Sequence, residues 1–490
     1  MKFIACVFIA VATNLCTAKE ELFRKQLQDA RLVNYIGISD FREKGTNNLT
    51  LSYTIAKPGY YLLTETIISE TRNGAIVVIA SNDVILDLHG NTITQSSDVT
   101  NVDGIFINNN LTNIVIKHGT IRKTTGNGVE VSSGCSNISL EDITVIECNR
   151  TGILFNGSAQ ALIKNSTLKE CLVSGTSSTT SHAIGLNLTY CTLFKIINSA
   201  FNTSKTTINT FNAYGFFGQN NSDVNLSNCV ASGNQGETIA TGFYAFNCTS
   251  LEFQNCIAQE NNATDTAVSE SYGFFMDNAK AVTLKNCHAA QNSAINTAAG
   301  FRMKASRYNH LSECVAQSNF ITGLGASDKA HGFMVDTTGS IGHRFEQCIA
   351  SGNQGSTNAL SLCAGFSVAT ATHCILANCL SQANGGTAGF GIGINLAADC
   401  ALCLVKECHV ISNRSLTRGQ AIGIRDEHAT GTSTLIDNFA FGNRDSSLTP
   451  SDKNYVLLYN DSKVVQDVQY NNISTITAGT RRNIGVKIGA

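Results

Sequence analysis

A recurring pattern of apolar, small and polar positions runs along the middle of this 490-residue chain. Each copy has Leu or Phe, then Cys three residues later, Ala after two more and Asn after three more. Successive Cys positions lie 27 to 34 residues apart, so the pattern is kept while the unit changes length. The copies are Leu226/Cys229/Ala231/Asn234, Phe253/Cys256/Ala258/Asn261, Leu284/Cys287/Ala289/Asn292, Leu311/Cys314/Ala316/Asn319 and Phe345/Cys348/Ala350/Asn353, then more loosely Leu376/Cys379/Ser381/Asn384 and Val405/Cys408/Val410/Asn413. Such a repeat predicts a stack of similar coils with loops inserted into them.

A second marker is a Gly followed by an apolar residue, which recurs once in each unit and extends the repeat toward the N-terminus. The members are Gly104-Ile105, Gly128-Val129, Gly152-Ile153, Gly185-Leu186, Gly215-Phe216, Gly242-Phe243, Gly273-Phe274, Gly300-Phe301, Gly332-Phe333, Gly365-Phe366 and Gly423-Ile424, with Gly391 or Gly393 as the missing one. These positions predict about twelve coils, each burying its apolar face against its neighbours.

The units predict strands and not helices. They are rich in Gly, Asn, Ser and Thr, and no apolar spacing of i, i+3, i+4, i+7 runs through them. In 282–284 and 287–289 every second residue is apolar, as a strand with one inward face requires. A coil of about 24 residues fits three short strands with tight turns. The sequence therefore predicts an all-β solenoid of three-strand coils stacked as parallel sheets.

The Gly-apolar and Asn-Cys-x-Ala coils resemble the right-handed parallel β-helix superfamily, which includes pectate lyases and polygalacturonases. The opening Asp87-Leu88-His89-Gly90-Asn91-Thr92-Ile93 and the following Asn113-Ile114-Val115-Ile116-Lys117-His118-Gly119-Thr120-Ile121 are similar to the first coils of such proteins. The resemblance covers roughly residues 75 to 445 and implies a right-handed parallel β-helix with capped ends. It is specific for the fold only.

The motifs of the enzymes in this superfamily are missing here. No Asp-Asp pair occurs, and Gly342-His343-Arg344 breaks the Gly-His-Gly of polygalacturonases. Their Arg-x-Lys has one formal match, at Arg302-Met303-Lys304, which stands without its companions. The Asp-Pro-His of epimerases cannot be supplied by the two prolines, Pro58 and Pro450.

The ends of the chain predict processing and capping. Met1-Lys2, an apolar run over 3–12 and Cys16-Thr17-Ala18 are typical of a secretory signal peptide over 1–18. We expect an N-terminal cap, with a short helix, and the first strands over 19–74, the β-helix over 75–445 and a C-terminal cap over 446–490. The protein is then expected to be secreted, extracellular or at the cell surface, or in the periplasm or on the outer surface if it is bacterial.

The repeated cysteines are interpreted as an inward ladder of small, weakly polar side chains. Because Ser199 and Asn438 fill the same slot in outer coils, we expect these cysteines to be free thiols. The Cα spacing of about 4.8 Å between cysteines of neighbouring coils is also shorter than the separation usual in disulfides. Bridging is more expected for the cysteines off the slot, which are Cys363, Cys374, Cys400 and Cys403.

Charge and composition exclude several partners. A net charge of −2 with 14% charged residues argues against nucleic acid, whose partners need a concentrated basic face. No apolar run after the N-terminal segment is long enough to span a membrane. We expect a monomer with no resident cofactor; calcium is the one alternative left open.

The outward positions of the strand after each Gly are the first place where function could lie. Residues two and four positions past Gly should face solvent if the residue directly after Gly faces inward. These positions carry rings and then charges, and we predict substrate binding by Phe217, Tyr244, Phe246 and Phe275. The alternative is that a connector covers the rings and makes them a secondary core.

The charged end of this strip offers catalytic candidates, namely Asp277, Arg302, Lys304 and Asp336. Asp277, Lys304 and Asp336 share one slot in consecutive coils, so the two carboxylates should lie about 9.6 Å apart at Cα. Side-chain flexibility brings this toward the spacing of inverting glycosidases. The residue types also resemble the grooves in which uronate lyases of the superfamily hold acidic sugar with calcium. The alternative is a plain surface charge ladder.

Long connectors over 262–272, 320–331 and 354–364 should gather on one side of the stack. The favoured interpretation is a non-catalytic protein that binds a glycan or a surface protein through this loop face and the strip. The alternative is a polysaccharide lyase or glycoside hydrolase acting on acidic polysaccharide. A rigid spacer is a third interpretation, and the fold alone does not choose among them.

Overall fold

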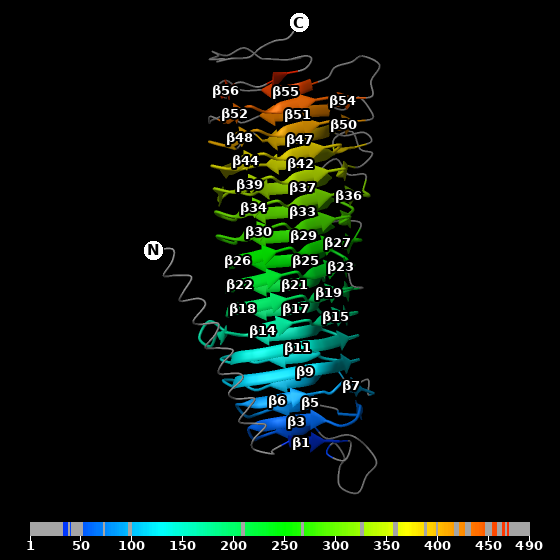
Figure 1. Ribbon diagram of the computed structural model, residues 1–490. Helices are drawn as coiled ribbons and strands as arrows, with labels where there is room; N and C mark the ends of the chain where they lie inside the picture. Colours follow the sequence, from blue (N-terminus) through cyan, green and yellow to red (C-terminus); the bar gives the residue numbers. More distant parts are fainter. Residues whose placement is uncertain are drawn as a thin grey trace, which may run out of the picture.

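The structure is a computed structural model, and it describes residues 33–37, 40, 52–71, 74–96, 100–206, 211–265, 269–323, 328–355, 361–386, 390–397, 400–415, 421–426, 433–445, 453–457, 463–465 and 468–469. These residues form a column of stacked coils whose strands pair in parallel along its whole length (Figure 1). The predicted solenoid of about twelve coils is confirmed, with about 13 turns. The described residues contain no helix long and apolar enough to cross a membrane.

Three sheets form the walls of the column. The 15-stranded sheet contains β2 Tyr53–Ile55, β5 Gly74–Ile79, β8 Val102–Ile107, β10 Val129–Val131, β12 Thr151–Asn156, β17 Ala183–Thr189, β21 Ala213–Gln219, β25 Ile239–Phe246, β29 Glu270–Asp277, β33 Thr297–Lys304, β37 Lys329–Asp336, β42 Leu362–Val368, β47 Phe390–Leu396, β51 Ala421–Asp426 and β55 Lys453–Leu457. The ten-stranded sheet contains β16 Ser177–Ser178, β20 Lys205–Thr206, β24 Gln235–Gly236, β28 Asn262–Ala263, β32 Ser293–Ala294, β36 Phe320–Ile321, β41 Gln354–Gly355, β46 Gly385–Gly386, β50 Arg414–Ser415 and β54 Arg444–Asp445.

The largest sheet has 30 strands, and most coils contribute two of them. They are β1 Val33–Ile36, β3 Gly59–Leu63, β4 Ile67–Ser69, β6 Val84–Asp87, β7 Thr92–Gln95, β9 Thr112–Arg122, β11 Ser136–Ile146, β13 Ile163–Lys164, β14 Thr167–Lys169, β15 Leu172–Ser174, β18 Cys191–Ile197, β19 Ala200–Asn202, β22 Ser222–Ser227, β23 Val230–Ser232, β26 Thr249–Gln254, β27 Ile257–Gln259, β30 Thr283–Lys285, β31 His288–Ala290, β34 His310–Ser312, β35 Val315–Gln317, β39 Arg344–Glu346, β40 Ile349–Ser351, β44 Ile375–Ala377, β45 Leu380–Gln382, β48 Leu404–Lys406, β49 His409–Ile411, β52 Thr434–Ile436, β53 Phe439–Phe441, β56 Lys463–Val465 and β57 Val468–Gln469. A two-stranded pair, β38 Ser340–Ile341 and β43 Ala371–Thr372, completes the described strands.

The repeated Gly and the apolar residue after it both face the interior, which interrupts the alternation of the strand. A Cβ on Gly273 would lie 2.6 Å from both Ala289 Cβ and the Gly300 carbonyl oxygen, so no side chain fits there. The phenyl rings that follow stack along the column, with centroids 4.7 to 4.9 Å apart from Phe243 through Phe366. Because two successive residues point inward, the residue before each Gly points outward.

The cysteine ladder is confirmed. The sixteen described cysteines are all buried free thiols, and each of the seven in the repeated slot donates from Sγ to a carbonyl of the preceding coil at 3.4 to 3.6 Å. Cys363, Cys374, Cys400 and Cys403 are free as well, so the expected bridging there is wrong. Cys363 donates to the Asn353 carbonyl, and Cys400 donates to the Val368 carbonyl.

The repeated asparagines form a second interior ladder beside the glycines. From Asn234 to Asn413 each side-chain amide donates to the Oδ1 of the asparagine in the next coil at 2.7 to 3.1 Å, and Asn443 is the last acceptor. The strands of the ten-stranded sheet from β24 onward each begin directly after one of these asparagines. They form the first residues of the connectors, which were predicted to lie on one side of the stack. Parts of those connectors, such as 266–268, 324–327 and 356–360, lie outside the described residues.

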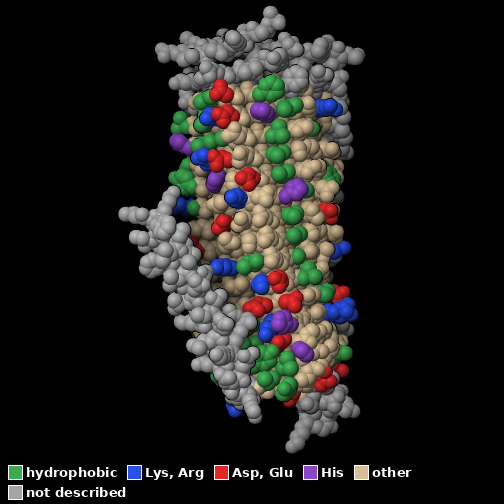
Figure 2. All heavy atoms as spheres, viewed as in Figure 1, with side chains coloured by type: hydrophobic (Ala, Val, Ile, Leu, Met, Phe, Trp, Pro, Cys, Tyr) green, Lys and Arg blue, Asp and Glu red, His purple; other side chains and the backbone are tan. Residues whose placement is uncertain are grey.

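The ends are described in part. Residues 33–36 form β1, which pairs with β3, so this part of the N-terminal cap is a strand and not a helix. Residues 19–32, where the apolar residues of the expected helix lie, are outside the described residues. Strands β55, β56 and β57 continue the stack into the segment predicted as the C-terminal cap. The predicted signal peptide and the rest of the caps lie outside the described residues. In Figure 2 the visible face is mostly uncharged polar surface, crossed lengthwise by a line of apolar side chains.

Candidate functional site

The candidate site lies on the outer face of the 15-stranded sheet, where three rows of side chains run along the column. The first row holds the residues directly before each Gly and includes Tyr214, Thr241, Tyr272, Ala299 and His331. The second row, two positions past Gly, holds Phe217, Tyr244, Phe275, Arg302 and Met334. The third row, four positions past Gly, holds Gln219, Phe246, Asp277, Lys304 and Asp336. The predicted order of rings followed by charges is confirmed.

An aromatic strip, which we define as Tyr214, Phe217, Tyr244 and Phe246, covers β21 and β25. The Tyr244 ring lies 5.3 Å from the Phe217 ring and is stacked on the Tyr214 ring at 5.4 Å. Phe217, Tyr244 and Phe246 are half-buried, and Tyr214 lies beneath them. Because the rings support one another, the strip presents a rigid apolar surface that still reaches solvent.

Phe275 differs from the other predicted ring residues because it is only 3% exposed. It is stacked under Tyr244 at 4.8 Å and belongs to a small apolar cluster with Tyr272, Ala299 and Met334. The alternative of a secondary core therefore holds for Phe275. This ring supports the strip from below and does not form its surface.

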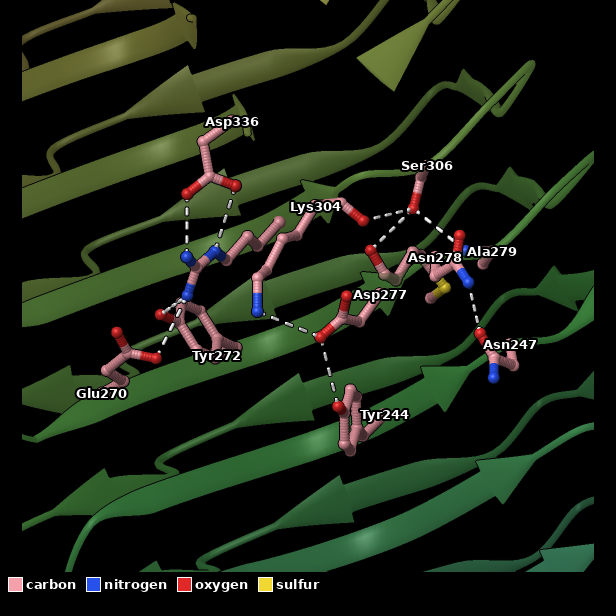
Figure 3. A network of polar contacts seen from close by, with 12 residues as sticks. Tyr244, Asn247, Glu270, Tyr272, Asp277, Asn278, Ala279, Lys304, Ser306 and Asp336 are labelled. Atoms are coloured by element: carbon pink, nitrogen blue, oxygen red, sulfur yellow. Dashed lines mark hydrogen bonds and ion pairs between the residues drawn. The ribbon is translucent and has the colours of Figure 1, made fainter. Parts of the chain in front are cut away.

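Arg302 organises the charged end and is 8% exposed. Its Nη2 and Nε donate to the two Asp336 oxygens at 2.8 and 3.3 Å, and its Nη1 donates to Glu270 at 3.1 Å and to the Tyr272 hydroxyl. Its guanidinium also lies over the Tyr272 ring at 4.9 Å and the Phe275 ring at 5.0 Å. Asp336 and Glu270 approach from opposite sides in Figure 3.

These contacts fix the charge of Arg302. Burial alone would lower the pKa of Arg302, but the Tyr272 oxygen and the carboxylates of Asp336 and Glu270 raise it above its ordinary value. Burial also raises the pKa of Tyr272 well above its ordinary value, so the phenol keeps its proton. A guanidinium held in this way cannot accept a proton, so Arg302 is excluded as a general base.

The third row contains a second, more exposed network. Lys304 Nζ lies 3.3 Å from Asp277 Oδ2, and the Tyr244 hydroxyl donates to the same oxygen at 3.4 Å (Figure 3). Burial, followed by the charge of Asp277, raises the pKa of Tyr244. The Asp277–Lys304 network thus joins the aromatic strip to the charged end.

The four predicted catalytic residues are brought together, with both carboxylates already paired with cations. Asp277 and Asp336 share one row with Lys304 between them, as the repeat predicts. Sequence reasoning missed Glu270, Tyr272 and Tyr214. The last two lie directly before a Gly, where simple alternation places them inside.

A buried histidine lies next to this network. His331 is 1% exposed, and its buried Nδ1 has no hydrogen-bond partner among the described residues. Burial, then the charges of Lys329 and Arg302, lower its pKa to about 3. The imidazole is therefore neutral and adds no charge to the site.

Residues 55–212 match the family described as "Right handed beta helix region". No curated protein matches the chain. Similar solved structures include ORF18 of Geobacillus virus E2 (TM-score 0.44, 13% identity, covering 65% of this chain and 62% of that one). A mutant tailspike protein of E. coli bacteriophage HK620 in complex with a pentasaccharide has a TM-score of 0.47 and 12% identity, covering 83% and 72%. Pectate lyase Pel9A has a TM-score of 0.32 and 13% identity, covering 63% and 78%.

The right-handed β-helix match thus covers residues 55–212, and the described residues as a whole form an all-β parallel solenoid. The chain spans 62% of the length of the Geobacillus virus protein.

Proposed function

We propose that the aromatic strip binds a glycan and that the protein does so at a cell surface or after secretion. The observation that carries the proposal is the in-register set of half-buried rings of Phe217, Tyr244 and Phe246. Flat apolar rings next to a few polar groups are typical of ligand sites. A sugar ring has apolar C–H groups that can pack on such rings and hydroxyls that can bind the polar groups. C–H groups of the sugar would pack on the rings, while its hydroxyls would reach Gln219, Asp277 and Lys304 at the edge.

The charge balance of the site favours a neutral glycan. Three carboxylates (Glu270, Asp277 and Asp336) face two cations (Arg302 and Lys304), which leaves one net negative charge. Both cations are held by these carboxylates, and an acidic polymer would have to compete for them. An acidic polysaccharide, the substrate class of the alternative interpretation, is therefore disfavoured.

The test is binding of the full-length protein to immobilised maltohexaose, cellohexaose, xylohexaose, chitohexaose and mannan, with alginate and polygalacturonate as acidic polymers. We expect binding to a neutral glycan, weakened about tenfold or more by Phe217→Ala and by Tyr244→Ala. Tyr244→Phe keeps the ring and loses only the hydroxyl bond to Asp277, so it should bind within a few-fold of the parent.

Tyr308→Ala is the matched control, because Tyr308 is 56% exposed and lies outside the strip. Thermal midpoints of all variants separate lost binding from lost folding. Binding that survives both strip substitutions, or that is confined to alginate and polygalacturonate and disappears with Lys304→Met, would overturn the proposal.

A further inference from the structure

The strands that follow the cysteine slot of each coil form a separate face on the outside of the 30-stranded sheet. They are β15, β19, β23, β27, β31, β35, β40, β45, β49 and β53, and the middle residue of each three-residue strand is buried. Because side chains alternate along a strand, the first and third residues point outward. Neighbouring strands pair in register, so the outward residues form two rows along ten coils.

The first of these rows is almost entirely apolar. It holds Leu172, Ala200, Val230, Ile257, His288, Val315, Ile349, Leu380, His409 and Phe439. Leu172 is 39% exposed, His409 is exposed, and the other eight are half-buried. A continuous apolar row that reaches solvent is typical of an interaction surface.

The second row is small or polar and also uncharged. It holds Ser174, Asn202, Ser232, Gln259, Ala290, Gln317, Ser351, Gln382 and Ile411. These two rows, up to Phe439, contain no Lys, Arg, Asp or Glu, and we call them the uncharged face.

Charged residues return on the other side of the bend that precedes the cysteine slot. A residue with a left-handed backbone, such as Asn228 or Asn255, marks this bend in each coil. The strands before it carry outward charges, among them Lys195, Glu252 and Arg344. The lack of charge therefore belongs to this one face and does not follow from the composition of the sheet.

The uncharged face has the size of a stable interface. Ten coils at a spacing of ~4.8 Å give a length of about 43 Å, and two rows of outward side chains give a width of about 15 Å. Each copy thus offers roughly 650 Å², and two copies would bury about 1,300 Å², within the ~1,200–2,000 Å² of specific protein interfaces.

The spacing and the missing charge select the partner. Side chains that repeat once per coil interlock along the whole face only with a partner of the same repeat, which a second copy of this chain provides. Two uncharged faces bring no like charges together, and their apolar rows can be buried against each other. Nucleic acid or an anionic membrane would need basic residues, which neither row supplies.

We propose that two copies of the chain associate through the uncharged face as a two-fold dimer, with the first row of one copy packed on the first row of the other. This proposal replaces the monomer expected from the sequence. The aromatic strip lies on a different sheet and stays open, so a dimer carries two strips. A polymer that reaches both strips is held by avidity; this consequence rests on the proposed function, whereas the dimer itself does not.

Sedimentation equilibrium of the full-length chain up to about 50 μM tests the dimer. We expect a Kd in the micromolar range or below that is retained at about 0.5 M salt, because burial of apolar surface is not screened. Ile349→Lys places a cation in the first row of both copies and should weaken the dimer about 100-fold or more. Ser351→Lys adds a charge in the second row, at a half-buried polar position, and should weaken the dimer about tenfold without loss of folding.

Ile375→Lys is the matched control for Ile349→Lys. Ile375 is also a half-buried outward isoleucine of the 30-stranded sheet, but it lies on β44, across the bend. This variant should dimerise like the parent. Thermal midpoints of the three variants separate lost association from lost folding, and Ser351→Lys keeps the test open if Ile349→Lys does not fold.

Three results would overturn the dimer. The first is a parent chain that is monomeric at about 50 μM. The second is a dimer that neither Ile349→Lys nor Ser351→Lys weakens. The third is a monomer that sediments with phosphatidylcholine vesicles and loses this binding with Ile349→Lys, which would assign the face to a lipid surface. Binding of short glycans such as cellohexaose should be equal in the parent and Ile349→Lys, so the dimer and the aromatic strip can fail independently.

Discussion

The outer face of the 15-stranded sheet carries carboxylates in two places with opposite surroundings. In the middle of the column, Asp336 and Glu270 close on Arg302, and Asp277 pairs with Lys304. Toward the N-terminus, Asp103 and Glu130 accept hydrogen bonds from Asn127 and form no ion pair with any residue that the structure describes. The residue types are the same, but the carboxylates occupy different rows of the face and meet different side chains from the adjacent coils.

This difference decides what each place can do. A carboxylate locked to a buried guanidinium stays charged and holds structure, and it cannot exchange protons with a ligand near neutral pH. A carboxyl group that is desolvated without a cation keeps its proton into the neutral range and can donate it. The middle region therefore holds its carboxylates in ion pairs, whereas Asp103 in the N-terminal region can change its protonation near neutral pH.

The largest expected effect comes from removing the cation of the middle region with Arg302→Met. This change leaves Asp336 and Glu270, each partly buried, without their cation, and it removes the cover of Phe275. Breaking a buried pair in this way typically costs about 3–5 kcal/mol. Thermal and urea unfolding of the full chain measure the loss.

Lys304→Met is the matched control for that experiment. Lys304 is 39% exposed and makes a single ion pair, so its loss should cost at most about 1 kcal/mol. Equal losses for the two variants would show that Arg302 does not organise this region.

A smaller effect is expected from His331, which lies beside the same network. Its pKa of about 3 is below the ordinary 6.5, so the stability contributed by neutral His331 is present above pH 6.5 and is lost as the pH falls toward 3. At pH 4.5 this loss is roughly 3 kcal/mol. His331→Leu should unfold at a higher temperature than the parent at pH 4.5, with a smaller difference at pH 7. A difference that does not depend on pH would contradict the buried neutral imidazole.

The fold could be predicted from the sequence because every coil places the same residue types at the same interior positions. Equivalent interior positions contact each other in neighbouring coils, as Ala289 and Asn292 show. The same is true of Cys287, so each contact type recurs in every repeat of the sequence. The rows of Phe275 and Asp277 could be predicted for the same reason, since alternation and register fix them. The bridging expected at Cys400 and Cys403 was wrong because position in the coil does not reveal that a thiol is satisfied by a nearby carbonyl.

The site itself was only half predictable. Glu130 follows the same rule as Tyr244, two positions past Gly, and could have been found by extending that rule to the first coils. Asp103 and Tyr272 could not, because Gly and its successor both turn inward and reverse the alternation before them. The ion pair between Arg302 on β33 and Glu270 on β29 joins residues at different positions of their coils, so the repeat spacing does not predict it.

The smallest expected effect concerns Asp103 and sharpens the contrast with the paired carboxylates. The folded-state pKa of about 7 lies above the ordinary 3.8, so the contribution of protonated Asp103 is complete below about pH 4 and is lost as the pH rises to about 7. Asp103→Asn keeps the oxygen that accepts the Asn127 N–H and removes the titration. The variant should therefore lose less stability than the parent between pH 4 and pH 7, by ~1–2 kcal/mol once solvent screening of this half-buried group is allowed for. Thermal midpoints across this range measure the difference, and Glu141→Gln should follow the parent throughout. Parallel curves for Asp103→Asn and the parent would mean that Asp103 does not change its protonation on unfolding in this range, and the contrast between the two regions would fail.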